Sequence, residues 1–473
     1  MKNETKNNKV ENKLEELTKV KNKWCLCSEE EKKIVFKFSE GYKNFISNNK
    51  TERECLSHCV LQAQKNGFVD LKDVIKNKTK LKVGDKIYAV NQNKTIALFV
   101  IGKENIENGL NILGAHIDSP RLDLKASPLY EKNGFCLFDT HYYGGIKNYQ
   151  WVTMPLALHG VVVKKDGTVI DVNIGEKDDD PVFYISDLLP HLKKPKSEEE
   201  ISGEQLDLIV ANMSYKNDKE SEVVIDNLKK ILSTHNIEES DFISAEIEVV
   251  PAGKARDMGF DKSMIVGYGH DDRSCAYTSL QAILECKNPQ KTAVCLLVDK
   301  EEIGSYGATG MKSRFFENCV AEIINLSGTY SELKLKRALA SSNMISSDVT
   351  AGYDPSWAAS YNIQTDAFLS CGLSFNKYTG SRGKSGSNDA SPEFISKLRK
   401  ILDDNKIFYQ FTEMGKVDQG GGGTIAYILA EYGMNVIDAG IPLLSMHAPW
   451  EVASKLDLYH AYLFYKAFLK EMK

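Results

Sequence analysis

The amino-acid sequence predicts an α/β fold: a mostly parallel sheet flanked by helices, interrupted by an inserted β-rich domain. Two observations predict it. Short runs rich in branched aliphatic residues alternate with helical patterns in the first and last parts of the chain, and this alternation stops between residues 126 and 254. Strands that alternate with helices are typical of a parallel sheet covered on both faces. The 473 residues are enough for such a domain and a smaller second one.

Composition and charge narrow the class of protein. Apolar residues make up 42% and charged residues 26%, which is typical of globular chains. A net charge of −5 argues against binding to nucleic acid or to an anionic membrane, since both need a concentrated basic face. No apolar run reaches the roughly 18 residues that cross a bilayer. The N-terminus is charged where a secretory signal is apolar. We therefore expect a cytoplasmic protein, and reduced thiols for its ten cysteines.

The elements before the insertion are predicted from periodicity. Residues 1–23 are polar and are expected to form a solvated leader. Helical patterns follow at Glu29–Asn48 and Thr51–Asn66. Two compact aliphatic runs, Thr95–Gly102 and Leu110–His116, are bounded by glycine or polar residues. Runs of this kind predict buried strands.

The insertion separates these elements from the rest of the sheet domain. Residues 126–254 contain strand-like pieces at Val161–Lys164 and Phe242–Val250 and are predicted to form the inserted domain. Residues 24–125 and 255–473 are predicted to form the α/β sheet domain. After the insertion we expect, in order, helix Asp272–Glu285, strand Thr292–Val298, helix Gly310–Asn318, strands Arg337–Ser342 and Asn435–Ala439, and helix Leu456–Glu471.

Five short segments place an acid or a histidine at the end of an apolar run. They are GAHIDSP with His116 and Asp118, GYGHDDRSC with Asp271, VDKEEIGSYGATG with Glu301 and Glu302, SSNMISSDVTAGYDP with Asp348, and PLLSMHAPWE with His447. Alone, each is more typical of a turn or a helix cap. In open α/β sheets, however, ligands bind outside the carboxyl ends of the strands. Two histidines and several acids at that edge are what two zinc ions sharing a carboxylate require.

These segments resemble the aspartyl aminopeptidase family of di-zinc metallopeptidases. GAHIDSPRLDLK, HDDRSC, DKEEIGSYGATG, SSDVTAGYDP and MHAPWE stand in the family's order and spacing, and the resemblance covers residues 30–470. The resemblance implies a sheet domain of the zinc-peptidase type, so that residues 24–125 and 255–473 would be the catalytic domain. It also implies two zinc ions per subunit and a role for each of seven residues. One ion would take His116 and Asp348, the other Glu302 and His447, with Asp271 as the bridge, Glu301 as the general base and Asp118 orienting His116.

The resemblance also implies an assembly. The insertion would be a dimerisation domain, and six dimers would form a tetrahedral dodecamer. ISDLLPHL, in the insertion, is similar to a family segment that enters a neighbouring active site, which makes His191 a substrate-binding candidate. Two departures bear on specificity. Ala351 stands where acid-specific members have a histidine, and Lys377 only approximately matches their substrate-binding lysine. Preference for acidic or for neutral N-terminal residues stays open.

The predicted function is therefore removal of N-terminal residues from peptides with free N-termini. Zinc acidifies a bound water, and a carboxylate such as Glu301 can take its proton. Cobalt or manganese fits the same ligands. One alternative is a di-zinc carboxypeptidase or deacylase on the same fold. The other is a non-catalytic scaffold, although no ligand and no base is missing from the motifs.

Overall fold

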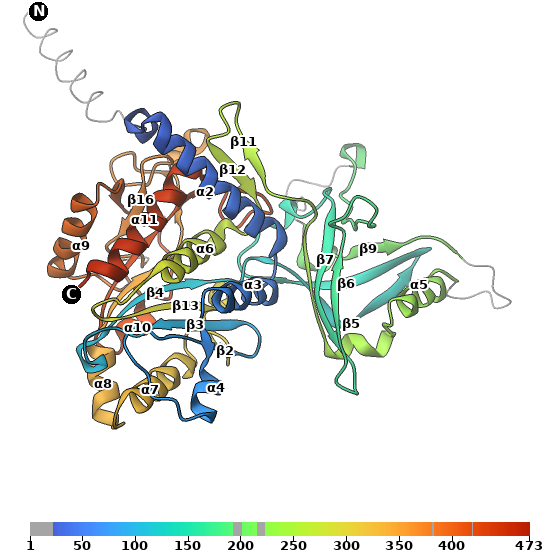
Figure 1. Ribbon diagram of the computed structural model, residues 1–473. Coiled ribbons are helices and arrows are strands. Elements are labelled where there is room, and N and C mark those ends of the chain that lie inside the picture. The colour runs from blue at the N-terminus through green and yellow to red at the C-terminus, as the bar shows by residue number, and fades with distance from the viewer. Residues whose placement is uncertain (1–21, 193–200, 215–222, 381–382, 419) are drawn as a thin grey trace, which may run out of the picture.

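The computed structural model describes residues 22–192, 201–214, 223–380, 383–418 and 420–473. The predicted leader therefore lies outside the described residues up to residue 21. Within the described ranges the strands form sheets of nine, six and five strands. Figure 1 shows the nine-stranded sheet between two layers of helices, with the six-stranded sheet to one side of it.

The nine-stranded sheet is the scaffold of the molecule. Its inner strands β13, β4, β14 and β18 are parallel neighbours, and every residue of β3, β4 and β13 is buried. This confirms the predicted mostly parallel α/β sheet. Its order is β1 (Val69–Asp70), β2 (Lys86–Asn91), β3 (Thr95–Val100), β13 (Thr292–Val298), β4 (Leu110–His116), β14 (Asn343–Ser346), β18 (Asn435–Gly440), β16 (Leu373–Asn376) and β17 (Tyr409–Thr412).

Helices cover both faces of this sheet because alternate strand residues point to opposite sides. Leu113 of β4 belongs to the cluster under one helix layer, and its neighbour Ile112 to the cluster under the other. One layer contains α2 (Glu29–Asn48), α3 (Glu52–Lys65), α6 (His270–Glu285), α9 (Pro392–Asp404) and α11 (Lys455–Glu471). The opposite layer contains α4 (Leu71–Lys76), α7 (Phe315–Ser327), α8 (Glu332–Ala340) and α10 (Ala426–Ala430).

The six-stranded sheet is built from residues of the insertion and has its own core around the fully buried Trp151. All of its pairings are antiparallel. It begins at Arg121, before the predicted boundary at residue 126, because β5 is one long strand. Its order is β8 (Val169–Ile174), β7 (Leu156–Val163), β10 (Ala245–Pro251), β5 (Arg121–Lys132), β6 (Phe135–Tyr143) and β9 (Leu208–Ala211), and α5 (Val223–Thr234) packs against it.

The five-stranded sheet was not predicted. Its strands are two to four residues long and come from distant segments, so none forms a recognisable run. Its order is β11 (Arg256–Met258), β12 (Met264–Gly267), β20 (Glu451–Ser454), β19 (Pro442–Leu444) and β15 (Thr350–Ala351). Through the pairings of this sheet, β12, which ends just before α6, is joined to the segments that carry Asp348 and His447.

Three predicted elements need correction. The strand expected at Arg337–Ser342 is wrong: this stretch belongs to α8, where Ser331 caps the helix. The helix expected at Gly310–Asn318 begins later, as α7. The strand expected from Phe242 starts at Ala245, because residues 239–244 form a 3₁₀ turn.

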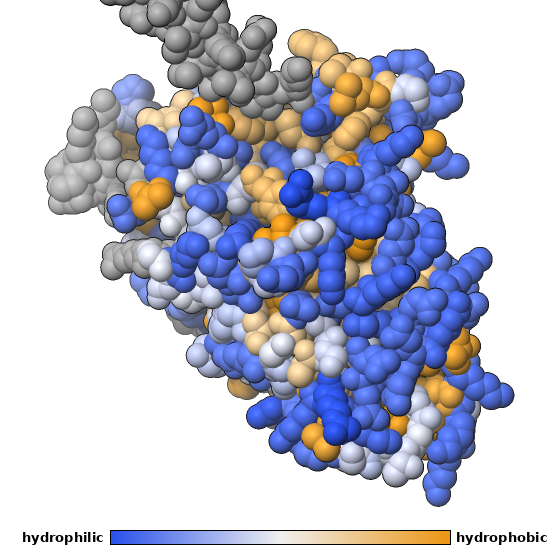
Figure 2. Space-filling view, turned by 90° about the vertical axis from the view of Figure 1, so that its left-hand side faces the viewer, coloured by the Kyte–Doolittle hydropathy of each residue, from blue (hydrophilic) through white to orange (hydrophobic). Residues whose placement is uncertain are grey.

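The exposed surface and the state of the cysteines are as expected from the charged-residue content and the cysteine pattern of the sequence. Figure 2 shows that the side of the molecule turned away from the six-stranded sheet is mostly hydrophilic, with apolar residues in small separate groups. No helix in the described ranges combines the length and the apolar character that a membrane crossing requires. All ten cysteines are free, and eight of them are buried.

Candidate active site

Three parallel strands bring the predicted residues to one edge of the nine-stranded sheet. His116 is the last residue of β4. Glu301 and Glu302 form the 3₁₀ turn that follows β13, and Asp348 lies two residues after the end of β14. Because β4 lies between β13 and β14, their carboxyl ends place these side chains together.

Asp271 lies between two histidines at the start of α6. One of its oxygens, Oδ1, is 3.3 Å from Nε2 of His116, and the other, Oδ2, is 3.3 Å from Nε2 of His447. His116 Nε2 is also 3.8 Å from an Asp348 oxygen. His447 Nε2 is 3.6 Å from an Oε atom of Glu302. A single buried carboxylate thus faces two imidazoles, each with a further acid beside it.

Both imidazoles turn Nε2 toward the acids of the site. Nδ1 of His116 is 3.0 Å from the backbone carbonyl of Asp118, and Nδ1 of His447 is 2.8 Å from the carbonyl of Gly145. A carbonyl oxygen only accepts hydrogen bonds, so in each ring Nδ1 carries the proton. In the neutral ring this leaves the Nε2 lone pair as the one that a metal ion would take, and the carbonyls fix the ring orientation.

Asp118 links His116 to the turn that carries the glutamates. It accepts hydrogen bonds from the backbone N–H groups of Glu301 at 3.2 Å and Glu302 at 3.1 Å. Its Oδ1 is 3.2 Å from Nδ1 of His116. The Tyr143 hydroxyl donates to Oδ2 at 2.9 Å. One buried carboxylate therefore fixes both the orientation of the His116 ring and the position of the Glu301–Glu302 backbone.

Glu451 of β20 plays the same part on the other side. One of its oxygens accepts the N–H of His447 at 2.8 Å, and the other accepts the N–H of Asp271 at 3.1 Å. His447 has a φ of 66°, in the left-handed region, and the bond to Glu451 helps to hold this turn. The five-stranded sheet thereby fixes the spacing between His447 and Asp271.

The site contains more carboxylates than the cationic side chains around it can neutralise. Burial and the carboxylates of Asp348, Asp118 and Asp271 raise the pKa of Glu301 to about 8. Burial and Asp271 raise the pKa of Glu302 well above its usual value. Burial lowers the pKa of His447, but Asp271 and Glu302 outweigh it and raise this pKa to about 10. Crowded buried carboxylates of this kind need protons or a cation between them.

The residues present fit zinc. In a tetrahedron with bonds of 2.0–2.1 Å, two ligand atoms lie about 3.3 Å apart, which matches the Asp271 contacts with both histidines. Ligand atoms of His116, Glu301 and Asp348, and of His116, Asp271 and Glu302, lie within 4.8 Å of one another. Oδ1 of Asp271 is buried without a hydrogen-bond partner in the described residues. Imidazole nitrogen and carboxylate oxygen are the ligands that zinc takes in catalytic sites.

The structure brings together seven of the predicted site residues: His116, Asp118, Asp271, Glu301, Glu302, Asp348 and His447. The two substrate-binding candidates lie apart from this cluster. His191 is exposed in a 3₁₀ turn of the insertion, Pro190–Leu192. Lys377 follows β16, and its ammonium pairs with Asp389 at 2.9 Å.

Sequence reasoning assigned no role to Glu451, Tyr143 or Gly145. Their signal was present, because MHAPWE ends on Glu451 and THYYGGIKNYQW contains the other two. What such residues do depends on hydrogen bonds that form only when the chain has folded, and no spacing rule reports those bonds. His270, next to Asp271, is buried and pairs with the Tyr42 hydroxyl at 2.6 Å.

Comparison with known proteins gives consistent matches. A family model described as aminopeptidase I zinc metalloprotease (M18) matches residues 45–469. A probable M18 family aminopeptidase 1 of Clostridium acetobutylicum is 55% identical over 96% of this chain and 98% of its own length. The crystal structure of aminopeptidase I from that organism has a TM-score of 0.88 at 53% identity, covering 95% of this chain and 99% of its own.

Two more distant structures match over a similar length. The crystal structure of an M18 aminopeptidase from Thermotoga maritima has a TM-score of 0.90 at 43% identity, covering 96% of this chain and 99% of its own. The S. cerevisiae mApe1 dodecamer shares the fold, with a TM-score of 0.74 at 20% identity, covering 92% and 96%.

Proposed function

Starting from the fact that the chain belongs to the M18 family of zinc aminopeptidases, we propose how its residues divide the work. The chain is a zinc metallo-aminopeptidase, a hydrolase. His116 and Asp348 would hold one zinc ion and Glu302 and His447 a second, with Asp271 shared between them. Cobalt or manganese fits the same ligands.

The observation that carries this proposal is the placement of Asp271. Its two oxygens reach two different imidazoles at the same distance of 3.3 Å. A carboxylate that served one ion would place its second oxygen on a donor of the protein or in water. Here both oxygens face metal-ligand nitrogens, as a bridging carboxylate requires.

Glu301 would serve as the general base. It lies beside His116 and Asp348, and the residues proposed as ligands leave its carboxylate free. Zinc in this site would supply an acidified water and would polarise the peptide carbonyl. Glu301 would take the proton from the attacking water and deliver it to the leaving amine. Asp118 holds the backbone of this turn, so that the glutamate keeps its position during the proton transfers.

The structure supports a broad or neutral preference at the first substrate residue. Ala351 offers no cation where acid-specific relatives have a histidine. The Lys377 ammonium, which would pair with an acidic substrate, already pairs with Asp389, a carboxylate that it shares with Lys384. We therefore expect substrates with neutral or apolar N-terminal residues to be cleaved at least as well as those with Asp or Glu.

The proposal extends to partners and location. We assign dimerisation to the insertion and place His191 in the cleft of a neighbouring subunit, within a tetrahedral dodecamer. A relative of the same fold, S. cerevisiae mApe1, is a dodecamer. The exposure of His191 leaves its ring accessible to a second chain. The cytoplasmic location stays a prediction from the sequence.

A peptide panel tests the proposal. Zinc-loaded enzyme is incubated with peptides that differ only in a free or N-acetylated first residue, over acidic, neutral and apolar first residues, with bound zinc measured on the same sample. We expect release of the first residue from the free peptides only, and two zinc ions per chain. Release of acetate or of C-terminal residues would contradict it, as would full activity with one zinc ion.

A further inference from the structure

The inserted sheet reaches into the active site through Tyr143. This residue ends β6 and is buried. Its hydroxyl donates to Oδ2 of Asp118 at 2.9 Å, the same oxygen that accepts the backbone N–H of Glu302. Asp118 is fully buried, so water does not replace a lost donor there. The orientation of Asp118 thus depends on a side chain of the insertion.

The Tyr143 ring is held by Arg121. The two residues face each other across the β5–β6 ladder. The guanidinium carbon of Arg121 lies 3.9 Å from the centre of the ring, which is cation–π contact. The cation fixes the plane of the ring and therefore the point at which the hydroxyl emerges.

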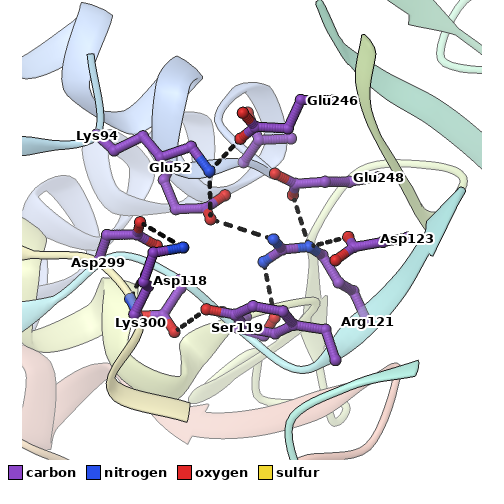
Figure 3. A network of polar contacts seen from close by, with 12 residues as sticks. Glu52, Lys94, Asp118, Ser119, Arg121, Asp123, Glu246, Glu248, Asp299 and Lys300 are labelled. Atoms are coloured by element: carbon purple, nitrogen blue, oxygen red, sulfur yellow. Dashed lines mark hydrogen bonds and ion pairs between the residues drawn. The ribbon is translucent and has the colours of Figure 1, made fainter. Parts of the chain in front are cut away.

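Arg121 in turn is fixed by carboxylates from both domains. Figure 3 shows its guanidinium between Glu52, Asp123 and Glu248, at 3.2, 2.7 and 3.3 Å. Glu52 belongs to α3 of the catalytic domain, and the other two belong to the insertion. Only 2% of Arg121 is exposed. Because a buried charge without partners strongly destabilises the fold, the guanidinium is held in contact with these carboxylates.

A second cation closes this group of charges. Lys94, in the turn between β2 and β3, pairs with Glu52 at 3.8 Å and with Glu246 of β10 (Figure 3). Glu52 thus meets one cation from each domain. The base of the insertion is thereby locked against the catalytic domain at the place where Tyr143 enters.

We propose that Tyr143, held by Arg121, is a positioning residue for the reaction. It would fix Asp118 and, through it, both the His116 ring and the backbone of Glu301. This rests on the proposed function, in which His116 holds zinc and Glu301 moves the proton. Partners that orient a metal-binding histidine in this indirect way typically contribute about 10–100-fold to metal affinity or activity.

The test removes one oxygen atom. Tyr143→Phe keeps the ring on Arg121 and deletes only the bond to Asp118. Zinc affinity is measured by competition with a chelator, and we expect one of the two sites to bind zinc about 10–100-fold more weakly than in the wild type. The kcat should fall by a similar factor. KM and the melting temperature should stay close to wild type. Tyr130→Phe is the matched control, because this tyrosine of β5 donates to Asp207, the residue before β9, and not to Asp118.

A double-mutant cycle tests whether Asp118 transmits the effect. In an Asp118→Asn background, adding Tyr143→Phe should change kcat and zinc affinity by less than about twofold, since coupled residues are not additive. The inference would be overturned if Tyr143→Phe kept the wild-type zinc affinity and kcat. It would also be overturned if Tyr130→Phe lost as much zinc affinity and kcat as Tyr143→Phe, or if Tyr143→Phe lowered both by its full factor in the Asp118→Asn background. If the wild-type chain itself binds no zinc pair, the proposed function falls as well.

Discussion

Glu301 and Glu302 are neighbours in sequence with different proposed tasks. We predict that Glu301→Gln keeps the fold and the bound zinc but loses about 10²–10⁴-fold in kcat, because an amide does not accept the proton of the attacking water. Turnover of a chromogenic aminoacyl substrate and zinc content, measured on the same preparation, check this. Glu393→Gln, at an exposed position of α9, should behave as wild type. More than a tenth of wild-type kcat in Glu301→Gln would contradict the assignment.

At the residue scale, the sequence predicted which acids and histidines lie together better than the residues that hold them in place. His116, Asp118 and Asp348 stand at or just beyond the ends of aliphatic strands, and the carboxyl edge of a parallel sheet gathers such residues. Glu451 and Tyr143 stand inside the motifs, but sequence reasoning assigned them no role, because each acts through hydrogen bonds that the fold creates. Tyr143 donates to Asp118, and Glu451 accepts the backbone N–H groups of Asp271 and His447.

At the scale of single elements, the end of β18 approaches the segment that carries Asp348. A Cβ added to Gly440 would lie 1.8 Å from the carbonyl oxygen of Asp348. We predict that Gly440→Ala displaces this segment. The free energy of unfolding should fall by about 1–3 kcal/mol, the usual cost of overpacking, and the zinc site that includes Asp348 should weaken.

Thermal melting and zinc competition measure the two effects. Gly328→Ala is the control, since a Cβ at Gly328 meets nothing within 4 Å and the backbone there is extended. If Gly440→Ala melts and binds zinc like Gly328→Ala, the close packing between β18 and Asp348 has no influence on the site.

Predictability of an element depended on its length and burial. Strands β3, β4 and β13 are continuous aliphatic runs because both of their faces are covered, and the sequence showed them. The strand expected at Arg337–Ser342 is wrong because Ala338 and Leu339, together with Leu335 just before that stretch, face the core as one side of a helix. The four-residue strand β14 that follows is too short to show a period.

At the scale of the whole molecule, activity should depend on assembly through His191. We predict that His191→Phe lowers kcat by about 10²–10³-fold, the loss expected for one donor to the developing oxyanion. Zinc content, oligomer mass and melting temperature should not change. Steady-state kinetics and native mass measurement check these expectations.

Mixed assemblies separate a role in the neighbouring site from a local one. Inactive Glu301→Gln subunits assembled together with His191→Phe subunits should regain activity, because some sites then combine an intact Glu301 with the partner subunit's intact His191. Mixtures that stay as inactive as their parents would show that this histidine does not act across the subunit interface.

The arrangement of the two sheets was the least predictable feature. The change of texture between residues 126 and 254 predicted an insertion rich in strands. It did not show that Arg121 and Tyr143 at its base meet Glu52 and Asp118 of the other domain. Contacts between domains are set by tertiary packing, which leaves no period in the sequence.

The proposed metal pair depends most directly on Asp271 as a shared ligand. Wild-type chain and Asp271→Ala are dialysed against the same buffered zinc and analysed for metal, with Asp404→Ala, an exposed acid of α9, as the control. We expect two zinc ions per chain in the wild type and the control, and loss of both ions together in Asp271→Ala. Two full equivalents of zinc in Asp271→Ala would contradict the shared carboxylate and, with it, the proposed metal pair.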